Sequence, residues 1–285
     1  MKLNKPKFWD KKKPNFLSYF LLPFTFPVII NNFFLKRKIK QPNHKIKKIC
    51  IGNIYVGGTA KTPLTVKIYE ILKNLKYRTA TLKKFYKDQI DEQIILKSKT
   101  IMYCEKNRYL ALNQAIRDNV DIIIFDDGLQ DRSISYDLSF VCFNNIKWIG
   151  NGHLIPAGPL REKIESLSKY DAVFLNGNVR DNSHIKSTIN KYNKDIKIFE
   201  CTYKPSNISQ FDTSAEYIIF SGIGNPESFK ETVKNNRLKV IKEIIFPDHY
   251  QYTVNDINNI MLIAKKLKAQ ILTTEKDYTK INFDK

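Results

Sequence analysis

The chain has 285 residues, which is enough for one large domain or two modest ones around a substantial buried core. Its 48 basic and 28 acidic residues give a formal net charge of +20, which favours anionic partners such as nucleic acid, acidic lipid or phosphorylated substrates. Only eight of the basic residues are arginine, and the lysines are spread over the whole chain, so we expect no nucleic-acid partner that is recognised by bidentate base contacts.

Residues 16–35 form the first predicted element, a strongly apolar segment with basic residues on both sides. At about 20 residues it is barely long enough to cross a bilayer, and Pro23 and Pro27 interrupt it. Basic residues at both ends argue against crossing, and no small-residue cleavage site follows that would indicate a signal peptide. We therefore expect residues 1–40 to form a membrane-associated segment lying in an anionic membrane surface, with a core helix as the alternative.

A strand predicted at residues 49–54 leads into a loop that is similar to a phosphate-binding loop. In the pattern G-x-x-x-x-G-K-[ST], backbone NH groups surround the phosphates while the Lys and the hydroxyl contact terminal phosphates and Mg²⁺. Lys61 and Thr62 are in place, but Tyr55 and Ala60 stand at the two glycine positions. Apolar residues at helical spacing follow, so the loop would lead into a helix N-terminus that favours an anion; an ordinary turn is the alternative. The residues expected to bind ATP are Tyr55, Val56, Gly57, Gly58, Thr59, Ala60, Lys61 and Thr62.

The rest of the chain alternates short apolar runs with helical patterns, which is typical of a mostly parallel sheet with helices on both faces. The predicted fold is an α/β, P-loop NTPase-like core at residues 41–205, with a smaller C-terminal α/β lobe at residues 206–285 that closes over the site. The polar stretch 204–215 is the expected seam. The predicted strands are residues 78–82, 121–126, 138–143, 172–175, 197–201, 217–221, 240–246 and 270–273, and helices are predicted at 226–235 and 254–267.

The four cysteines are far apart in the sequence and form no C-x-x-C pair, so their spacing indicates neither a zinc site nor a redox site. Each lies in or beside an apolar run, and we expect buried, reduced thiols. They are Cys50, Cys104, Cys142 and Cys201.

The predicted strand at residues 121–126 ends in two carboxylates, Asp126 and Asp127, followed by Gly128. Asp-Gly after a strand is often only a turn. Behind a phosphate-binding loop the same carboxylates are expected to hold Mg²⁺, which prefers one or two carboxylates together with phosphate oxygens and water. Three further segments are rich in polar and turn-forming residues, and periodicity assigns them no role. They are residues 150–162, 246–250 and 272–277.

The order of these motifs resembles the tetraacyldisaccharide 4′-kinase family, the lipid A 4′-kinases. The resemblance rests on residues 52–63 (GNIYVGGTAKTP), 126–130 (DDGLQ), 150–162, 246–249 (FPDH) and 273–277 (TTEKD). It implies transfer of the ATP γ-phosphate to the 4′-hydroxyl of an acylated glucosamine disaccharide 1-phosphate, with ATP and Mg²⁺ as cofactors. It also implies a location at the cytoplasmic face of the inner membrane, reached through an N-terminal membrane-associated helix. We infer no obligate protein partner from the sequence.

The resemblance assigns roles to individual residues. Lys61 would neutralise phosphate charge, and Asp91 is the best match for the catalytic base that accepts the proton of the sugar hydroxyl. His249, from the second lobe, would orient Asp91 when the lobes close; without the resemblance it would be taken for a solvated loop histidine. The metal would be held by Thr62, Asp126 and Asp127. Four further residues would contact either the substrate or the metal, and the resemblance does not separate the two roles. They are Gln130, Asn151, Arg161 and Glu162.

The chain departs from the family at Ala60, where relatives usually have Gly; a positive φ there would cost about 1 kcal/mol or more. The segment before Asp91 lacks the family's Gly-Tyr-Gly turn, Asp131 replaces a common His, and relatives continue beyond Asp277. Three alternatives remain: another nucleotide switch such as a partition-type protein or a GTPase, a nucleic-acid-binding module, or a degenerate relative that binds the lipid without catalysis. The guanine motif Asn-Lys-x-Asp is absent from the sequence.

Overall fold

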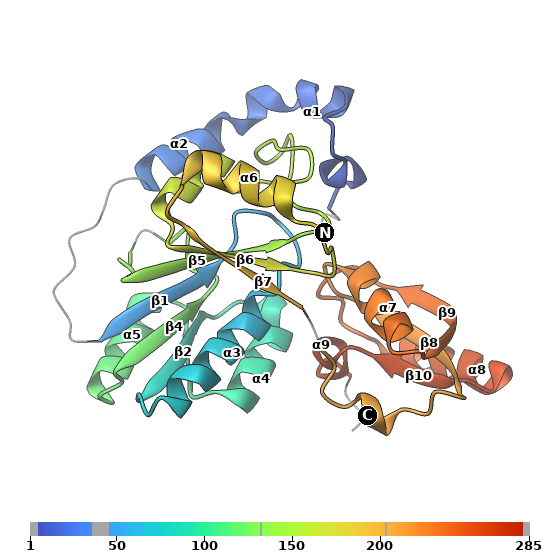
Figure 1. Cartoon of the computed structure of the whole chain (residues 1–285). Coiled ribbons are helices and arrows are strands. Elements are labelled where there is room, and N and C mark those ends of the chain that lie inside the picture. Colours follow the sequence, from blue (N-terminus) through green and yellow to red (C-terminus); the bar gives the residue numbers. More distant parts are fainter. Residues whose placement is uncertain (1–4, 36–45, 132, 203, 282–285) are drawn as a thin grey trace. The chain divides into compact units, whose positions relative to one another are not determined.

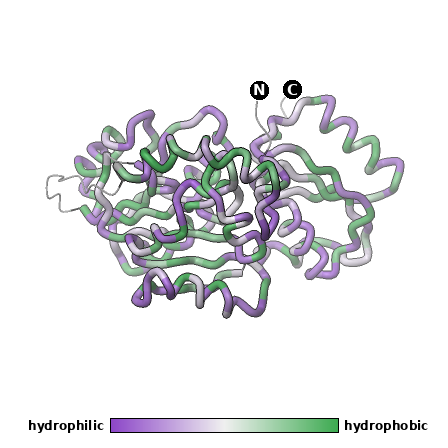
Figure 2. Tube along the Cα trace, turned by 90° about the horizontal axis from the view of Figure 1, so that it is seen from above, coloured by the Kyte–Doolittle hydropathy of each residue, from purple (hydrophilic) through white to green (hydrophobic). Residues whose placement is uncertain are grey.

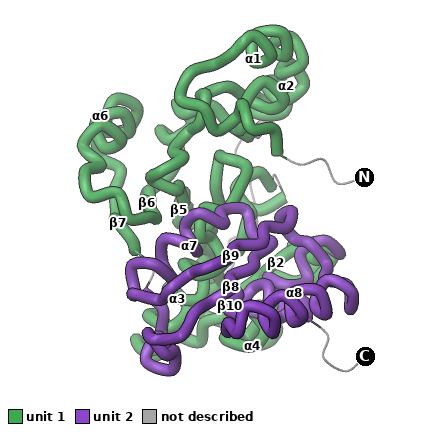
Figure 3. The backbone as a smooth tube through the Cα atoms, turned by 90° about the vertical axis from the view of Figure 1, so that its right-hand side faces the viewer, with its two compact units in different colours: residues 1–86, 96–202 green, residues 87–95, 203–285 purple. Residues whose placement is uncertain are grey.

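The computed structural model describes residues 5–35, 46–131, 133–202 and 204–281. The chain divides into two compact units (Figure 3). Unit 1 consists of Met1–Tyr86 and Leu96–Thr202, and unit 2 consists of Lys87–Ile95 and Tyr203–Lys285. The short segment Lys87–Ile95, which the sequence analysis placed inside the nucleotide-binding core, therefore groups with the C-terminal part of the chain.

Unit 1 is built on a seven-stranded sheet in the order β3-β2-β4-β1-β5-β6-β7 (Figure 1). All neighbouring strands are parallel. The chain moves to one side of β1 for β2 to β4 and to the other side for β5 to β7, so the topology reverses around β1, where α/β proteins bind ligands at the carboxyl ends of strands. The strands are β1 Lys47–Gly52, β2 Thr79–Lys84, β3 Met102–Glu105, β4 Ile122–Asp126, β5 Leu138–Asn144, β6 Ala172–Asn176 and β7 Lys197–Cys201.

Helices cover both faces of this sheet because alternate strand residues point to opposite sides. On one face, Ile49 and Ile51 of β1 pack with Leu64 of α3 (Lys61–Asn74). On the other face, Cys50 packs with Leu112 of α5 (Arg108–Arg117). Helix α6 (Ser183–Tyr192) covers the β5 and β6 end of the same face as α5, while α4 (Ile90–Lys99) begins in the segment of unit 2. The predicted α/β class with a parallel sheet and helices on both faces is confirmed.

All four cysteines are free thiols. Cys50 and Cys142 are buried, as predicted, and burial raises the pKa of both thiols. The prediction of burial is wrong for Cys104 and Cys201, which are partly exposed because they lie on β3 and β7, the two edge strands of the sheet.

The apolar N-terminal segment forms two short helices, α1 (Phe16–Phe20) and α2 (Phe26–Leu35). A 3-10 turn at Leu22–Thr25 with Pro23 near its start separates them. Within the described part of the chain, no helix has both the length and the apolar character needed to cross a membrane. Large apolar side chains of this segment are nevertheless exposed. They are Phe16, Leu17, Tyr19, Phe20, Leu22, Phe24, Phe26, Ile29, Ile30 and Phe33.

Unit 2 contains a three-stranded parallel sheet in the order β10-β8-β9, formed by β8 (Glu216–Ser221), β9 (Lys239–Ile245) and β10 (Gln270–Thr273). Helices α7 (Pro226–Asn235) and α8 (Val254–Leu267) connect the strands, and the short α9 (Glu275–Tyr278) follows β10. Its small core gathers Tyr217 and Ile219 of β8 with Val233 of α7. Figure 2 colours the chain by hydropathy and shows hydrophobic stretches alternating with hydrophilic ones along the trace.

Candidate active site

The candidate phosphate-binding loop of unit 1 joins β1 to α3. Asn53 donates a hydrogen bond from Nδ2 to Thr59 Oγ1 (2.9 Å), and Asn176 donates from Nδ2 to the Thr59 carbonyl oxygen (3.1 Å). Gly57 adopts a φ of +140°, a backbone conformation that residues with a side chain rarely take. The loop is thus fixed by polar contacts and leads into the N-terminus of α3, where free NH groups and the helix dipole favour phosphate.

Ala60 is the N-cap residue of α3 and adopts the left-handed conformation, with φ +67° and ψ 28°. For a residue with a Cβ atom this conformation costs about 1–2 kcal/mol. The methyl group also offers no oxygen that could cap the first NH groups of the helix. The departure from glycine therefore falls at a position that requires positive φ, and the loop carries local strain.

Asp126, at the end of β4, is completely buried. Its Oδ2 accepts hydrogen bonds from Thr62 Oγ1 (3.0 Å) and Lys83 Nζ (2.8 Å), and its Oδ1 accepts one from Thr65 Oγ1 (3.4 Å). Lys83 is 1% exposed and lies opposite Asp126 in the register of β2 and β4. Lys83 was not predicted to have a role, although a lysine directly after the apolar part of a buried strand is an unusual residue in that position.

Asp127 lies within a second polar network. Lys61 Nζ is 3.8 Å from Asp127 Oδ2, and Arg161 Nη1 donates to Asp127 Oδ1 (3.0 Å) and to Gln130 Oε1 (3.3 Å). Gln130 in turn donates from Nε2 to Glu162 Oε1 (2.9 Å). Five of the residues singled out in the sequence are therefore brought together in unit 1.

Arg108 supports this network from α5 and was missed in the sequence analysis. It is buried, donates to the carbonyl oxygen of Asp127, and forms an ion pair with Asp131 (Nη1 to Oδ2, 2.7 Å). Asp127 has a φ of +62°, so the arginine stabilises a strained turn. Asp131, which replaces a common histidine of the family, thus has a specific partner in this chain.

The donor set in unit 1 fits Mg²⁺. Thr62, Asp126 and Asp127 offer only oxygen atoms, which this cation prefers. Across the described ranges, no group of three or more His, Cys, Asp or Glu side chains could hold a metal ion by itself, so phosphate oxygens and water would have to complete the coordination. Both oxygens of Asp126 already accept protein hydrogen bonds, and its part would be to orient the Thr62 hydroxyl.

The side chains of two other predicted residues of unit 1, Tyr55 and Asn151, make structural contacts away from the network around Asp127. Tyr55 is 1% exposed and packs against Leu160, and its ring also lies beside the backbone of Gly57 in the loop. Asn151 donates from Nδ2 to Ser18 Oγ (2.9 Å), which ties the loop at residues 150–162 to α1. Neither side chain belongs to the network around Asp127.

Helix α2 also contacts residues next to this network. Asn32 Nδ2 donates to the carbonyl oxygen of Arg161 (2.9 Å), and Val28 packs against Tyr55 and Leu160. The apolar N-terminal segment is therefore joined directly to the loop that carries Arg161 and Glu162.

In unit 2, Asp91 and His249 lie together. Asp91 is the second residue of α4 and is 1% exposed, and His249 Nδ1 is 3.1 Å from both of its carboxylate oxygens. From the sequence, this pair was expected to assemble when the lobes close. Both residues instead belong to unit 2, because the segment Lys87–Ile95 packs with the C-terminal part of the chain.

Two lysines extend this pair and were not predicted: Lys276 lies in the segment 272–277, to which periodicity assigned no role, and Lys280 lies beyond it. Lys276 Nζ is 3.7 Å from Asp91 Oδ2 and 3.1 Å from Glu92 Oε1, and Lys280 Nζ is 3.5 Å from Asp91 Oδ2. Lys276 and Lys280 are four residues apart and so lie on the same side of the helical turn that begins in α9.

The charges around Asp91 determine its ionisation. Burial by itself raises the pKa of the Asp91 carboxyl. The hydrogen bond from His249 and the charges of Lys276 and Lys280 outweigh burial, so the pKa lies below its ordinary value. Burial also opposes the charge of Lys276, but Glu92, Asp248 and Asp91 together raise its pKa. Asp91 is therefore a carboxylate at neutral pH, which is the form that can accept a proton.

Known proteins are similar to this chain over nearly its whole length. A sequence profile of the family described as tetraacyldisaccharide-1-P 4′-kinase matches residues 16–285. A tetraacyldisaccharide 4′-kinase of Pelagibacter ubique (strain HTCC1062) is 50% identical over 282 residues, covering 99% of this chain and 89% of the relative. The enzyme of that name from Rickettsia bellii (strain OSU 85-389) is 35% identical over 298 residues, covering 99% and 90%.

A solved structure has the same fold. It is described as the "apo" form of LpxK from Aquifex aeolicus in complex with ATP, and it matches with a TM-score of 0.66 and 24% sequence identity over 94% of this chain and 91% of that chain. At this identity the likeness concerns the fold alone. The profile match and the full-length relatives settle the family: the chain belongs to the tetraacyldisaccharide 4′-kinases.

Proposed function

We propose that this protein transfers the γ-phosphate of ATP to the 4′-hydroxyl of tetraacyldisaccharide 1-phosphate, a step of lipid A biosynthesis. The observation that carries the proposal is the presence in one family member of two complete sets of groups: the Lys61, Thr62, Asp126 and Asp127 set in unit 1 and the Asp91–His249 pair in unit 2. Phosphoryl transfer to an alcohol needs both, because one must hold the charged phosphates and the other must receive the hydroxyl proton.

The residues of unit 1 would bind ATP. The backbone of the loop at residues 55–60 would surround the phosphates, and the Lys61 ammonium group, poised 3.8 Å from Asp127, would neutralise the charge that develops on the transferred phosphoryl group. Mg²⁺, when bound with ATP, supplies further charge neutralisation. Arg161 donates to Asp127 and is itself held by Gln130, so the arginine would help the acidic residue to keep its orientation when phosphates enter.

Asp91 would act as the base. The 4′-oxygen forms a bond to the γ-phosphorus, the bond from that phosphorus to the bridging oxygen of ADP breaks, and the hydroxyl proton passes to the Asp91 carboxylate. The hydrogen bond from His249 Nδ1 fixes the direction of that carboxylate. Because the transition state of phosphoryl transfer is loose, the base has mainly to orient the hydroxyl and to accept its proton, and a carboxylate with a lowered pKa is adequate for that purpose.

The N-terminal segment would bring the enzyme to its lipid substrate. Its exposed aromatic and aliphatic side chains match an amphipathic element that lies in a membrane surface, and the net charge of +20 favours anionic lipids. A pocket of about 300 Å³ lies at the same segment, with Leu22, Ile29, Leu154 and Lys163 among its lining residues. This combination supports association with an anionic membrane surface, which the family resemblance would place at the cytoplasmic face of the inner membrane.

The test is a transfer assay with labelled ATP and detergent-dispersed tetraacyldisaccharide 1-phosphate. We expect Mg·ATP-dependent product from the wild-type protein and a loss of about 10²–10⁴ in kcat for Asp91→Asn, with the KM for ATP nearly unchanged. Asp195→Asn, at an exposed aspartate of unit 1, is the matched control and should keep full activity.

Absence of transfer under conditions in which a relative is active would refute the proposed reaction. Binding of the lipid without transfer would instead identify a degenerate relative. If Asp91→Asn acts mainly on the KM for ATP, Asp91 is not the base.

A further inference from the structure

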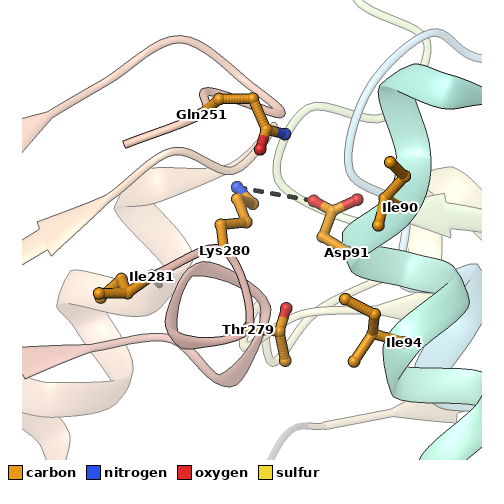
Figure 4. A pocket seen from close by; sticks show the side chains of 7 residues that line it. All are labelled: Ile90, Asp91, Ile94, Gln251, Thr279, Lys280 and Ile281. Carbon is orange, nitrogen blue, oxygen red and sulfur yellow. Dashed lines mark ion pairs between the residues drawn. The ribbon is translucent and has the colours of Figure 1, made fainter. Parts of the chain in front are cut away.

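Lys280 is a buried lysine of unit 2 that contacts three groups. Its side chain is only 2% exposed. Its Nζ lies 3.5 Å from Asp91 Oδ2, 2.8 Å from Asp277 Oδ1 and 3.0 Å from the carbonyl oxygen of Gly222. Figure 4 shows its ammonium group pointing toward the Asp91 carboxylate.

Asp277, the second carboxylate beside Lys280, is held in place by several hydrogen bonds. Asp277 is completely buried and accepts hydrogen bonds from the Gly222 backbone NH (3.0 Å), the Tyr252 hydroxyl (3.0 Å) and the Thr274 hydroxyl (2.6 Å). These contacts fix the position of the Lys280 ammonium group independently of Asp91. The charge is therefore already in place beside the carboxylate.

The surroundings of this ion pair strengthen it. Asp91 and Lys280 line a pocket of about 230 Å³ whose other lining residues include Ile90, Ile94 and Ile281. Gln251 and Thr279 also line this pocket, but the side chains of Lys280 and Asp91 are themselves only 2% and 1% exposed, so each charge acts on the other more strongly than it would in water.

Lys276 and His249 are other groups near Asp91 that can carry a positive charge. Lys276 Nζ lies 3.1 Å from Glu92, 3.6 Å from Asp248 and 3.7 Å from Asp91, so three carboxylates share its charge, although it lowers the pKa of Asp91 more than Lys280 does. His249 carries a positive charge only when it is protonated. Among the described residues, two carboxylates share the charge of Lys280, which are Asp277 (2.8 Å) and Asp91 (3.5 Å).

We propose that Lys280 is a positioning residue of the transfer reaction, whose buried ammonium group holds the Asp91 carboxylate in the ionised form and in the orientation that accepts the hydroxyl proton. The inference rests on the proposed function, because it gives Lys280 a role toward the proposed base. Lys280 touches neither phosphate nor sugar in this role and acts through Asp91.

The consequence of removing the charge has a definite sign. Lys280 is one of the groups that lower the pKa of Asp91 against the effect of burial. Without its charge the pKa of Asp91 rises, so Asp91 is protonated, and unable to act as a base, up to a higher pH. The loss of activity is then large at acid pH and small at alkaline pH.

The experiment compares pH profiles of kcat/KM for the wild type, Lys280→Met, Lys280→Arg and Lys266→Met. Lys280→Met keeps most of the apolar stem, and its acid limb should move to higher pH by about one unit or more. Lys280→Arg keeps the charge and should restore the wild-type limb. Lys266 is an exposed lysine of α8, and its replacement should leave the profile unchanged.

A second readout does not depend on turnover. In protein labelled with ¹³C at aspartate carboxyl groups, the Asp91 signal is assigned as the one that disappears in Asp91→Asn, and its titration gives the pKa directly. We expect a pKa below the ordinary carboxyl value in the wild type and a higher one in Lys280→Met.

An unchanged acid limb, or a loss by the same factor at every pH, would overturn the proposal, since a purely structural role scales activity uniformly. If Lys280→Met does not fold, a wild-type Asp91 that titrates at or above the ordinary value still overturns it. If the wild type transfers no phosphate, the proposed function fails, while the carboxyl titrations of wild type and Lys280→Met continue to test the charge effect.

Discussion

Ala60→Gly should make unit 1 more stable. Ala60 has a φ of +67°, and the left-handed conformation costs a residue with a Cβ atom about 1–2 kcal/mol. Glycine relieves that cost but gains more freedom in the unfolded chain, which is worth about 0.5–1 kcal/mol in the opposite direction. The difference leaves a net stabilisation of about 0.5–1 kcal/mol.

The assay is urea unfolding followed by tryptophan fluorescence. The chain has two tryptophans, Trp9 and Trp148, and both lie in unit 1, so the signal reports the unit that contains Ala60. Ala111→Gly is the control, because Ala111 is buried in α5 with helical geometry, and glycine there should destabilise unit 1 by about 1 kcal/mol or more. Opposite signs for the same chemical change would show that the backbone angle decides the outcome.

The affinity for ATP should change by less than about threefold, because strain that is present in the loop before and after binding cancels from the binding free energy. Two results would refute this reasoning. A less stable Ala60→Gly variant would mean that contacts of the methyl group outweigh its strain. A tenfold or larger gain in ATP affinity would mean that the strain belongs to the free loop alone.

Two further predictions concern unit 1. Lys83→Met should destabilise the unit by about 3–5 kcal/mol in urea unfolding, because it leaves the Asp126 carboxylate buried without its cation; Lys84→Met, at the half-buried neighbour, should cost less than about 1 kcal/mol, and equal effects would contradict the assignment. Phe20→Ser combined with Phe24→Ser should weaken sedimentation with anionic vesicles by about tenfold or more while leaving ATP binding intact, and unchanged vesicle binding would remove the membrane role of these side chains.

The nucleotide-binding part of the fold could be predicted because its signals are local. The buried β-branched run of β1 and the apolar strand that ends in Asp126 and Asp127 are visible without any tertiary knowledge. The edge strand β3, Met102–Glu105, escaped prediction because it has four residues, all half-buried, and so shows neither a continuous apolar run nor alternation. Helix α5 after it was not predicted either, although its buried residues Ala111, Leu112 and Ala115 recur at helical spacing behind the buried Arg108.

The candidate site could be predicted only where a motif marks it. Lys61, Thr62 and Asp126 belong to a recurring loop and strand pattern, and Asp91 and His249 followed from the family resemblance. Lys83 and Lys280 carry no such mark. Lysine is usually exposed, and only the three-dimensional partners of these two, Asp126 and Asp91, explain why they are buried.

The grouping of residues 87–95 with the C-terminal unit has a consequence for synthesis of the chain. Asp91 and His249 are 158 residues apart in sequence. At about 5–20 residues per second, a ribosome needs about 8–30 s to reach His249 after it has added Asp91. During that interval the carboxylate has neither the histidine nor the two lysines beside it, and α4 starts with an acidic residue that nothing yet buries. The proposed base therefore cannot be complete on a partly synthesised chain, whereas the strands β1 and β4, with the phosphate-binding loop and Asp126, have all been made before residue 130.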